Sequence, residues 1–112
     1  MITDELVSFE TAKLAKEKGF DVPTDFCYEK SGNLVRVGSI SAPTQSLLQR
    51  WLREEERIEV NAFWDSADCI WFSYAKKMDI PDLVGTFMPD GFFISYESAI
   101  EDALKYALEN LI

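Results

Sequence analysis

The chain has 112 residues, of which 47% are hydrophobic, so one domain with a sizeable core is expected. Acidic residues outnumber basic residues by 20 to 11, which gives a net charge of −9 at pH 7. This excess argues against direct nucleic-acid binding and against contact with anionic membranes, because both need a basic surface patch.

The sequence also lacks the usual signals for membrane insertion or export. Its longest uncharged apolar run falls well short of the roughly 20 residues that a membrane-spanning helix needs. Residues 1–5 (MITDE) are acidic and have neither the basic nor the apolar region of a signal peptide. We therefore expect a cytoplasmic protein with no membrane contact. In that reducing compartment Cys27 and Cys69 are expected to be buried free thiols, with a disulfide as the alternative.

A first helix is expected to end at Lys18, because Gly19 can take the left-handed conformation that follows many helices. Its start is ambiguous, since Thr3 and Ser8 are both suitable N-caps. The buried side of this helix is expected to consist of Phe9, Ala12, Ala15 and the following Phe20.

Residues 26–30 and 34–37 are expected to form two strands joined across residues 31–33. A second helix should follow from Pro43 to about Glu56, because proline suits the first helical turn, where its missing N–H costs nothing. The apolar stripe of this helix, which indicates packing on a sheet, consists of Leu47, Leu48, Trp51 and Leu52.

The most strand-like region comprises residues 58–64 and 69–74, which residues 65–68 connect. A hairpin closed at this connection pairs Trp64 with Cys69, and the side chains on each face follow from that register. One face is then expected to carry Ile58, Val60, Ala62, Trp64, Cys69 and Trp71. The other face is expected to carry Glu59, Asn61, Phe63, Ile70, Phe72 and Tyr74.

Residues 84–87 and 92–94 are expected to form a second, short hairpin across residues 88–91, where Pro-Asp-Gly is a turn signal. Ser95 should cap the last helix. A dimerising coiled coil is the alternative for this segment, but it needs at least about three heptads, which the segment does not hold. The stripe expected to face the core consists of Tyr96, Ala99, Ile100, Ala103, Leu104, Ala107, Leu108 and Leu111.

Catalytic and metal chemistry find little support in this sequence. The absence of histidine removes Ser-His-Asp and Cys-His catalysis and most zinc sites. No Cys-x-x-Cys pair, glycine-rich phosphate loop or calcium loop occurs. The pairs Asp65 with Asp68 and Asp79 with Asp82 fall in turns, where aspartate is common because it binds nearby backbone. We expect no catalytic residue, cofactor or metal site, with a carboxylate-based hydrolase as an alternative.

The aromatic residues of the predicted hairpin indicate protein binding. Base stacking usually comes with cations that hold the phosphates, and the nearby charges are mostly acidic. If helices cover only one face of the hairpin, its other face presents an apolar patch to a partner. A second copy of the chain is one candidate partner, which would give a homodimer. The candidate protein-binding residues are Phe63, Ile70, Phe72 and Tyr74.

Three segments together resemble a known group of proteins. They are residues 6–20 (LVSFETAKLAKEKGF), residues 42–54 (APTQSLLQRWLRE) and residues 96–108 (YESAIEDALKYAL). In this order they resemble small uncharacterised proteins that bacteriophages and prophages of gut bacteria encode, and residues 58–94 match that group least well. The resemblance implies a setting in the cytoplasm of a bacterial host. It implies no activity, ligand or catalytic residue.

We predict one α+β domain over residues 1–112, with two layers. A mainly antiparallel sheet of about four to six strands should be covered on one face by three helices. The predicted function is that of a phage accessory protein that acts by protein–protein interaction and not by catalysis. The alternative is an acidic mimic of nucleic acid that inhibits a host DNA- or RNA-binding protein. It is motivated by residues 58–112, where ten acids and three bases give a net charge of −7.

Overall fold

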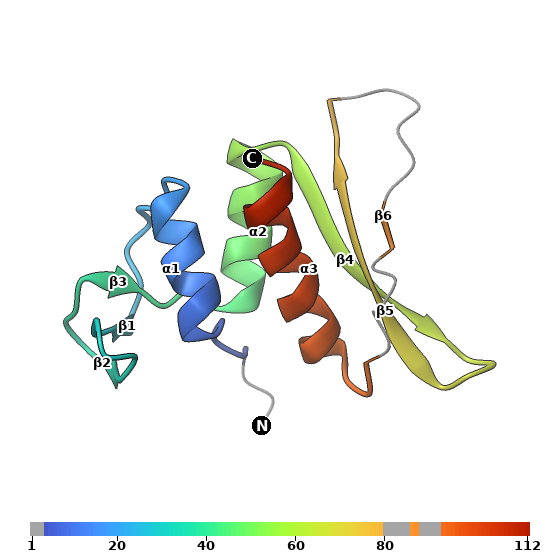
Figure 1. Ribbon diagram of the computed structural model, residues 1–112, viewed down its shortest axis with the longest axis horizontal. Helices are drawn as coiled ribbons and strands as arrows, with labels where there is room; N and C mark the ends of the chain where they lie inside the picture. Colours follow the sequence, from blue (N-terminus) through green and yellow to red (C-terminus); the bar gives the residue numbers. More distant parts are fainter. Residues whose placement is uncertain (1–3, 80–85, 88–92) are drawn as a thin grey trace.

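The computed structural model describes residues 4–79, 86–87 and 93–112, and within them the chain is an α+β domain, as predicted (Figure 1). In these residues a helix is followed by three strands, a second helix, three more strands and a third helix. The elements are α1 (Phe9–Glu17), β1 (Cys27–Tyr28), β2 (Leu34–Val35), β3 (Ile40–Ser41), α2 (Gln45–Glu55), β4 (Ile58–Asp65), β5 (Ile70–Lys77), β6 (Thr86–Phe87) and α3 (Tyr96–Asn110).

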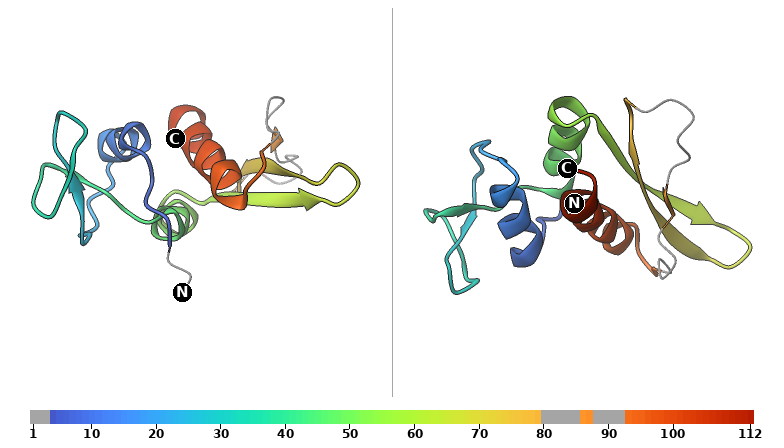
Figure 2. Two further views of the ribbon diagram at one scale, coloured as in Figure 1. Left: turned by 90° about the horizontal axis from the view of Figure 1, so that it is seen from below. Right: turned by 45° about the horizontal axis from the view of Figure 1, so that its top comes forward.

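The strands divide between two antiparallel sheets, ordered β2-β1-β3 and β4-β5-β6, rather than forming one continuous sheet. The helices stand between the two sheets (Figure 2). Helices α2 and α3 pack on the hairpin of β4 and β5, whereas α1 contacts α3 and β3. The three helices therefore do not share one sheet face. Strands β1 to β3 are each two residues long and form a small separate sheet on the side of α1 away from α3.

Helix α1 begins after Ser8, which resolves the ambiguous start. The hydroxyl of Ser8 accepts a hydrogen bond from the backbone N–H of Thr11 at 3.2 Å, which satisfies one of the free donors of the first turn. The helix ends at Glu17, and Gly19 follows in the left-handed region at φ 101°, as expected. Phe20 is buried and packs its ring edge-on against Trp51.

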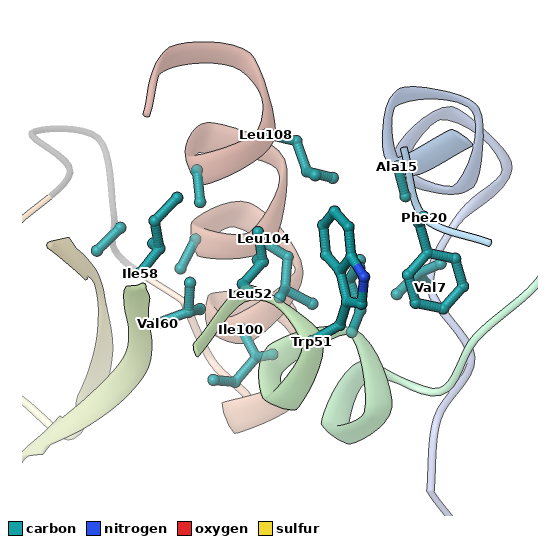
Figure 3. Close-up of a cluster of buried hydrophobic side chains, with 14 of the residues drawn as sticks. Val7, Ala15, Phe20, Trp51, Leu52, Ile58, Val60, Ile100, Leu104 and Leu108 are labelled. Carbon is teal, nitrogen blue, oxygen red and sulfur yellow. The ribbon is translucent and has the colours of Figure 1, made fainter. Parts of the chain in front are cut away.

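The core lies between α2, α3 and the near side of β4 (Figure 3). Helix α2 is capped by Thr44, so Pro43 lies just before the cap and not in the first turn. Helix α3 is capped by Ser95 as predicted, but Tyr96 and Leu111 at its ends are only partly covered. The stripe of α3 confirmed as buried consists of Ala99, Ile100, Ala103, Leu104, Ala107 and Leu108.

The hairpin of β4 and β5 is present, but its register differs from the predicted one by two residues. Trp64 pairs with Trp71 and not with Cys69, which lies in the turn of residues 66–69 with φ 55°. The carboxylate of Asp65 accepts hydrogen bonds from the backbone N–H of Ala67 and Asp68, which closes the turn one residue later than expected. A shift of two residues keeps the side chains that remain in the two strands on their predicted faces, because strand side chains alternate with a period of two.

The second hairpin was predicted from residues 84–94, of which residues 84–85 and 88–92 lie outside the described residues. Thr86 and Phe87 form β6, which pairs with β5 at Ala75 and Tyr74. Phe93 makes an isolated antiparallel bridge with Trp71, further along the same edge of β5. Residues 86–87 and Phe93 therefore both run antiparallel to β5 along the same edge of that strand, and they do not pair with each other.

The two cysteines are free, as favoured over a disulfide. Cys27 is half-buried in β1, and Cys69 is exposed in the hairpin turn. The expectation of two buried thiols was therefore wrong, because Cys27 is only half-buried and the register shift moves Cys69 from the strand into the turn.

Tyr28 links the small sheet to the segment before α1 and gives a prediction about alkaline stability. Its hydroxyl donates a hydrogen bond to the backbone oxygen of Val7 at 2.7 Å. Burial raises the pKa of Tyr28 above its ordinary value of 10.0, and the charge of Glu101 raises this pKa further. A phenol that binds its proton more tightly in the folded state stabilises the fold below pH 10, and this contribution is lost as the pH rises through the folded-state pKa.

We therefore expect Tyr28→Phe to be less stable than the unmodified protein near neutral pH. The difference should shrink from about pH 10 upward, where an unfolded tyrosine ionises. Urea denaturation of both proteins across this range measures the difference in free energy of unfolding. A difference that stays constant up to the most alkaline pH would contradict this role for the phenol.

Candidate protein-binding surface

The hairpin of β4 and β5 extends past the helices that cover it (Figures 1 and 2). Exposure along the helix-facing side of β4 shows where the cover ends. Ile58 is 0% exposed, Val60 2% and Ala62 8%, whereas Trp64 is 50% exposed. Helices α2 and α3 therefore seal the first half of the hairpin and leave its tip in solvent.

The four predicted protein-binding residues lie together on the face of the hairpin that points away from α2 and α3. Phe63 pairs with Phe72 across the ladder, and Ile70 pairs with Asp65 two positions nearer the turn. The rings of Phe63 and Tyr74 meet edge-on with their centroids 5.4 Å apart. We call Phe63, Ile70, Phe72 and Tyr74 the outer patch.

The outer patch is partly covered by the chain itself. Phe63 is 44% exposed, while Ile70, Phe72 and Tyr74 are half-buried. Tyr74 also pairs with Phe87 of β6. Burial raises the pKa of Tyr74, and the nearby charge of Glu59 adds to this rise. The most accessible apolar side chain of the outer patch is therefore Phe63.

A second group of aromatic residues lies on the opposite, helix-facing side at the hairpin tip, and sequence reasoning missed it. The rings of Trp64 and Trp71 lie 5.3 Å apart, and those of Trp71 and Tyr96 meet edge-on at 5.3 Å. We call Trp64, Trp71 and Tyr96 the aromatic row. Trp64 and Tyr96 are exposed, although the sequence placed both in the covered layer.

The length of the hairpin contained a signal for this exposure. An eight-residue strand spans about 26 Å. Two helices packed side by side cover about 20 Å, because each is about 10 Å wide. A strand crossed by two helices therefore extends beyond them, and the residues at its end lose their cover.

The turn of the hairpin carries Asp65 and Asp68, and Glu97 follows Tyr96 at the start of α3. Residues 58–75 contain three acids and residues 93–104 contain another three, and neither range contains a lysine or arginine. The nearest bases along β5 are Lys76 and Lys77, at the end of the strand opposite the tip. A partner for this region is therefore expected to tolerate or to require negative charge.

The acid pairs considered for catalysis have local structural contacts. The carboxylate of Asp65 closes the hairpin turn, and that of Asp79 binds the guanidinium of Arg57 at 3.1 Å. Asp82 lies outside the described residues. Within the part of the chain that the structure describes, no group of three or more His, Cys, Asp or Glu side chains could hold a metal ion.

A cavity of about 300 Å³ lies between the segment before α1, the loop at residues 24–26 and the start of α2. Its polar side chains are engaged in local contacts. Asp4 accepts a hydrogen bond from Ser46, and the hydroxyl of Thr24 donates to the backbone oxygen of Phe26. These contacts assign the lining a structural role, so the hairpin is the better candidate for function.

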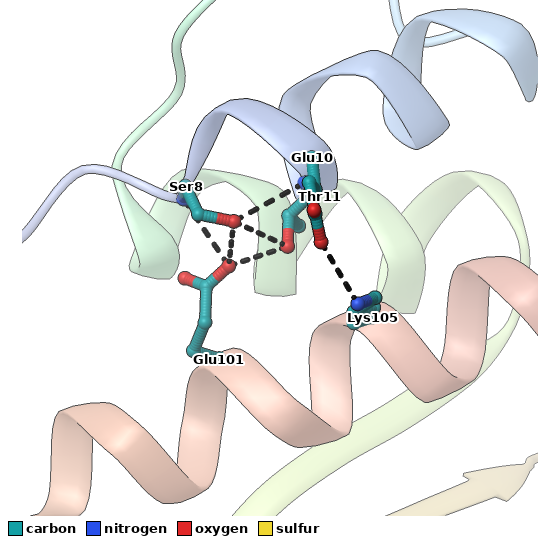
Figure 4. Close-up of polar contacts among 5 residues, drawn as sticks. All are labelled: Ser8, Glu10, Thr11, Glu101 and Lys105. Carbon is teal, nitrogen blue, oxygen red and sulfur yellow. Dashed lines mark hydrogen bonds and ion pairs between the residues drawn. The ribbon is translucent and has the colours of Figure 1, made fainter.

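Glu101 of α3 binds the start of α1 (Figure 4). This contact holds α1 against α3, one of the two helices that pack on the hairpin. Its carboxylate accepts hydrogen bonds from the backbone N–H of Ser8 at 3.1 Å, from the Ser8 hydroxyl at 2.9 Å and from the Thr11 hydroxyl. The side-chain amide of Gln45 in α2 donates to the same carboxylate at 3.1 Å. The carboxylate of Glu101 thereby joins all three helices.

These observations define the chain as an α+β domain in which the exposed aromatic side chains that the structure describes lie at the tip of one hairpin and at the adjoining start of α3. Comparison with protein-family models, with curated proteins and with solved structures gave no match. Among the helices that the structure describes, none is long and apolar enough to cross a membrane.

Proposed function

We propose that this protein is a phage-type accessory protein that acts by binding another protein through the hairpin of β4 and β5, and not by catalysis. The observation that carries the proposal is the exposure of neighbouring aromatic side chains on β4, with Phe63 44% exposed on one face and Trp64 50% exposed on the other. Large aromatic side chains are enriched at protein interfaces and depleted from ordinary surface, because burying them supplies much of the binding energy.

The position of the hairpin also supports binding. Its base is anchored by fully buried side chains, including Ile58, Ala75 and Leu104. A rigid base with an accessible tip presents the binding side chains without a large cost in conformational entropy. The phage and bacterial setting rests on the resemblance of residues 6–20, 42–54 and 96–108. The partner is a host or phage protein in the bacterial cytoplasm, or a second copy of the chain.

Phe63→Asp tests the outer patch. Phe63 is already largely exposed, so the substitution should leave the fold intact while placing a charge where a partner's apolar surface would lie. We expect partner capture from a bacterial host, or self-association, to weaken by about tenfold or more, as for a central interface residue. Val37→Asp is the matched control, because Val37 is 90% exposed in the loop after β2.

Two measurements read this test. Sedimentation mass at two concentrations detects a homodimer, and quantitative pull-down with mass spectrometry detects another protein. The proposal predicts that Phe63→Asp loses the association while Val37→Asp keeps it. Equal capture by all three proteins, together with an unchanged monomeric mass, would count against it.

A further inference from the structure

Strand β4 is the edge strand of its sheet, and its free edge is only partly blocked. Among the strands that the structure describes, the sheet order β4-β5-β6 leaves one side of β4 without a neighbour. The backbone oxygen of Val60 accepts a hydrogen bond from the side-chain amide of Gln49 at 2.6 Å, and the backbone N–H of Ala62 donates to the side chain of Asn61 at 3.0 Å. Side chains therefore occupy the free edge at Val60 and Ala62.

Trp64 continues this edge beyond the blocked positions. Backbone groups of a strand point to alternate sides, so Trp64 directs its N–H and C=O to the same free side as Val60 and Ala62. Trp71, which lies opposite Trp64 in the ladder, directs its backbone groups away from β4. It exchanges two hydrogen bonds with Phe93 on the other side of β5, as the same alternation requires. The tip of β4 therefore presents strand-pairing groups to solvent.

The aromatic row lies beside this edge and has no cation of its own. All eleven lysine and arginine residues fall within the described ranges. The cation–π contacts among them are Lys13 with Phe9 and Arg36 with Phe26, both in the other half of the molecule. Trp64, Trp71 and Tyr96 are the ring types that stack best on guanidinium and ammonium groups.

Charge selects the partner's chemistry. The acids at the tip are Asp65 and Asp68 of the hairpin turn and Glu97 beside Tyr96, whereas Lys76 and Lys77 lie at the other end of the hairpin. A second copy of the chain seated on the aromatic row would bring the same acids to this contact and would be repelled there. A basic segment would be attracted, and its cationic side chains would find both carboxylates and ring faces at the tip.

We propose that the hairpin tip binds a basic, extended segment of a partner protein. The segment pairs its backbone with the free edge of β4 at Trp64, and its arginine or lysine side chains stack on the aromatic row, a form of strand addition. This inference rests on the proposed protein-binding function and names the chemistry of the partner. It uses the aromatic row and not the outer patch, so the two can fail separately.

A synthetic peptide that alternates arginine and threonine is a suitable probe, because its extended form places every arginine on one side. Calorimetric titration of the full chain at low salt should show binding. Trp64→Ala should weaken that binding by about tenfold or more, since truncating an aromatic anchor has this effect. Leu34→Ala is the matched control, because Leu34 is 47% exposed in the other sheet, and it should leave the affinity within about twofold. Circular dichroism confirms that both variants are folded.

A second peptide, N-methylated at its arginines as well as its threonines, keeps the charge and removes the backbone donors of both edges. Its binding should be about tenfold weaker or lost, because strand addition depends on those donors. Failure of the unmodified peptide to bind would overturn the inference, and so would binding that is insensitive to both Trp64→Ala and N-methylation, which charge attraction alone explains. If Phe63→Asp abolishes capture of the natural partner while the peptide fails to bind, the proposed function stands and this inference falls.

Discussion

Replacing Leu104 by alanine is expected to lower the free energy of unfolding by about 3 to 4 kcal/mol. Leu104 lies in the middle of α3 and is 0% exposed, in the cluster that joins this helix to α2 and β4 (Figure 3). Truncation removes buried apolar surface and leaves a cavity that the surrounding helices cannot fill without moving.

Urea denaturation followed by circular dichroism measures this effect. Leu34→Ala is the matched control, because Leu34 is 47% exposed on β2, and its loss should change stability by less than about 1 kcal/mol. Similar losses for Leu104→Ala and Leu34→Ala would show that α3 is not the centre of the core.

Replacing Glu101 by alanine is expected to lower the free energy of unfolding by about 2 to 3 kcal/mol. The substitution removes the acceptor that Ser8, Thr11 and Gln45 share. Thr11 is fully buried, so its hydroxyl would lose its acceptor without gaining water and would keep only its hydrogen bond with the Ser8 hydroxyl. Gln45 would keep only its bond to the backbone oxygen of Glu97. The carboxylate also lies at the positive end of α1, where a negative charge is favourable.

Glu10→Ala is the control for this prediction at the same junction of α1 and α3. Glu10 forms an exposed ion pair with Lys105 at 3.1 Å, and exposed pairs contribute little because water screens them. Thermal and urea denaturation should therefore separate the two variants clearly. If Glu101→Ala were as stable as Glu10→Ala, the cluster in Figure 4 would not join the helices.

The helices could be predicted from sequence because local chemistry determines where they begin and which side they bury. Ser8 and Ser95 cap their helices through side-chain bonds to the first turn, and those bonds depend only on residues three positions away. The apolar stripe of α3 has one possible orientation toward a core. Pro43 was predicted in the first turn of α2 but lies before the helix, because the side chain of Thr44 caps it by accepting a hydrogen bond from the backbone N–H of Leu47.

The division into two sheets could not be predicted, since it depends on where α1 packs after the elements have formed. Residues 26–41 contain strand signals, but nothing in them states which strand they join. In the structure β3 contacts α1, and α1 in turn contacts α3, so the helices separate the small sheet from the large hairpin. The sequence also gave no sign of β3, which is two residues long.

The candidate surface could be predicted in part, for a reason rooted in strand geometry. Phe63, Ile70, Phe72 and Tyr74 share a face as expected even though the register is shifted, because a shift of two residues preserves alternation. The exposure of Trp64 was missed, because it depends on where α3 crosses the strand and not on the residues of the strand.

The most direct test of hairpin-mediated binding is a cross-linking experiment in bacterial cells that contain the protein. A photoreactive benzoylphenylalanine replaces Phe63 in one variant and Val37, on the opposite side of the molecule, in another. The account predicts a covalent adduct of defined mass from position 63 and none from position 37. Adducts of equal yield at both positions, or at position 37 alone, would contradict it.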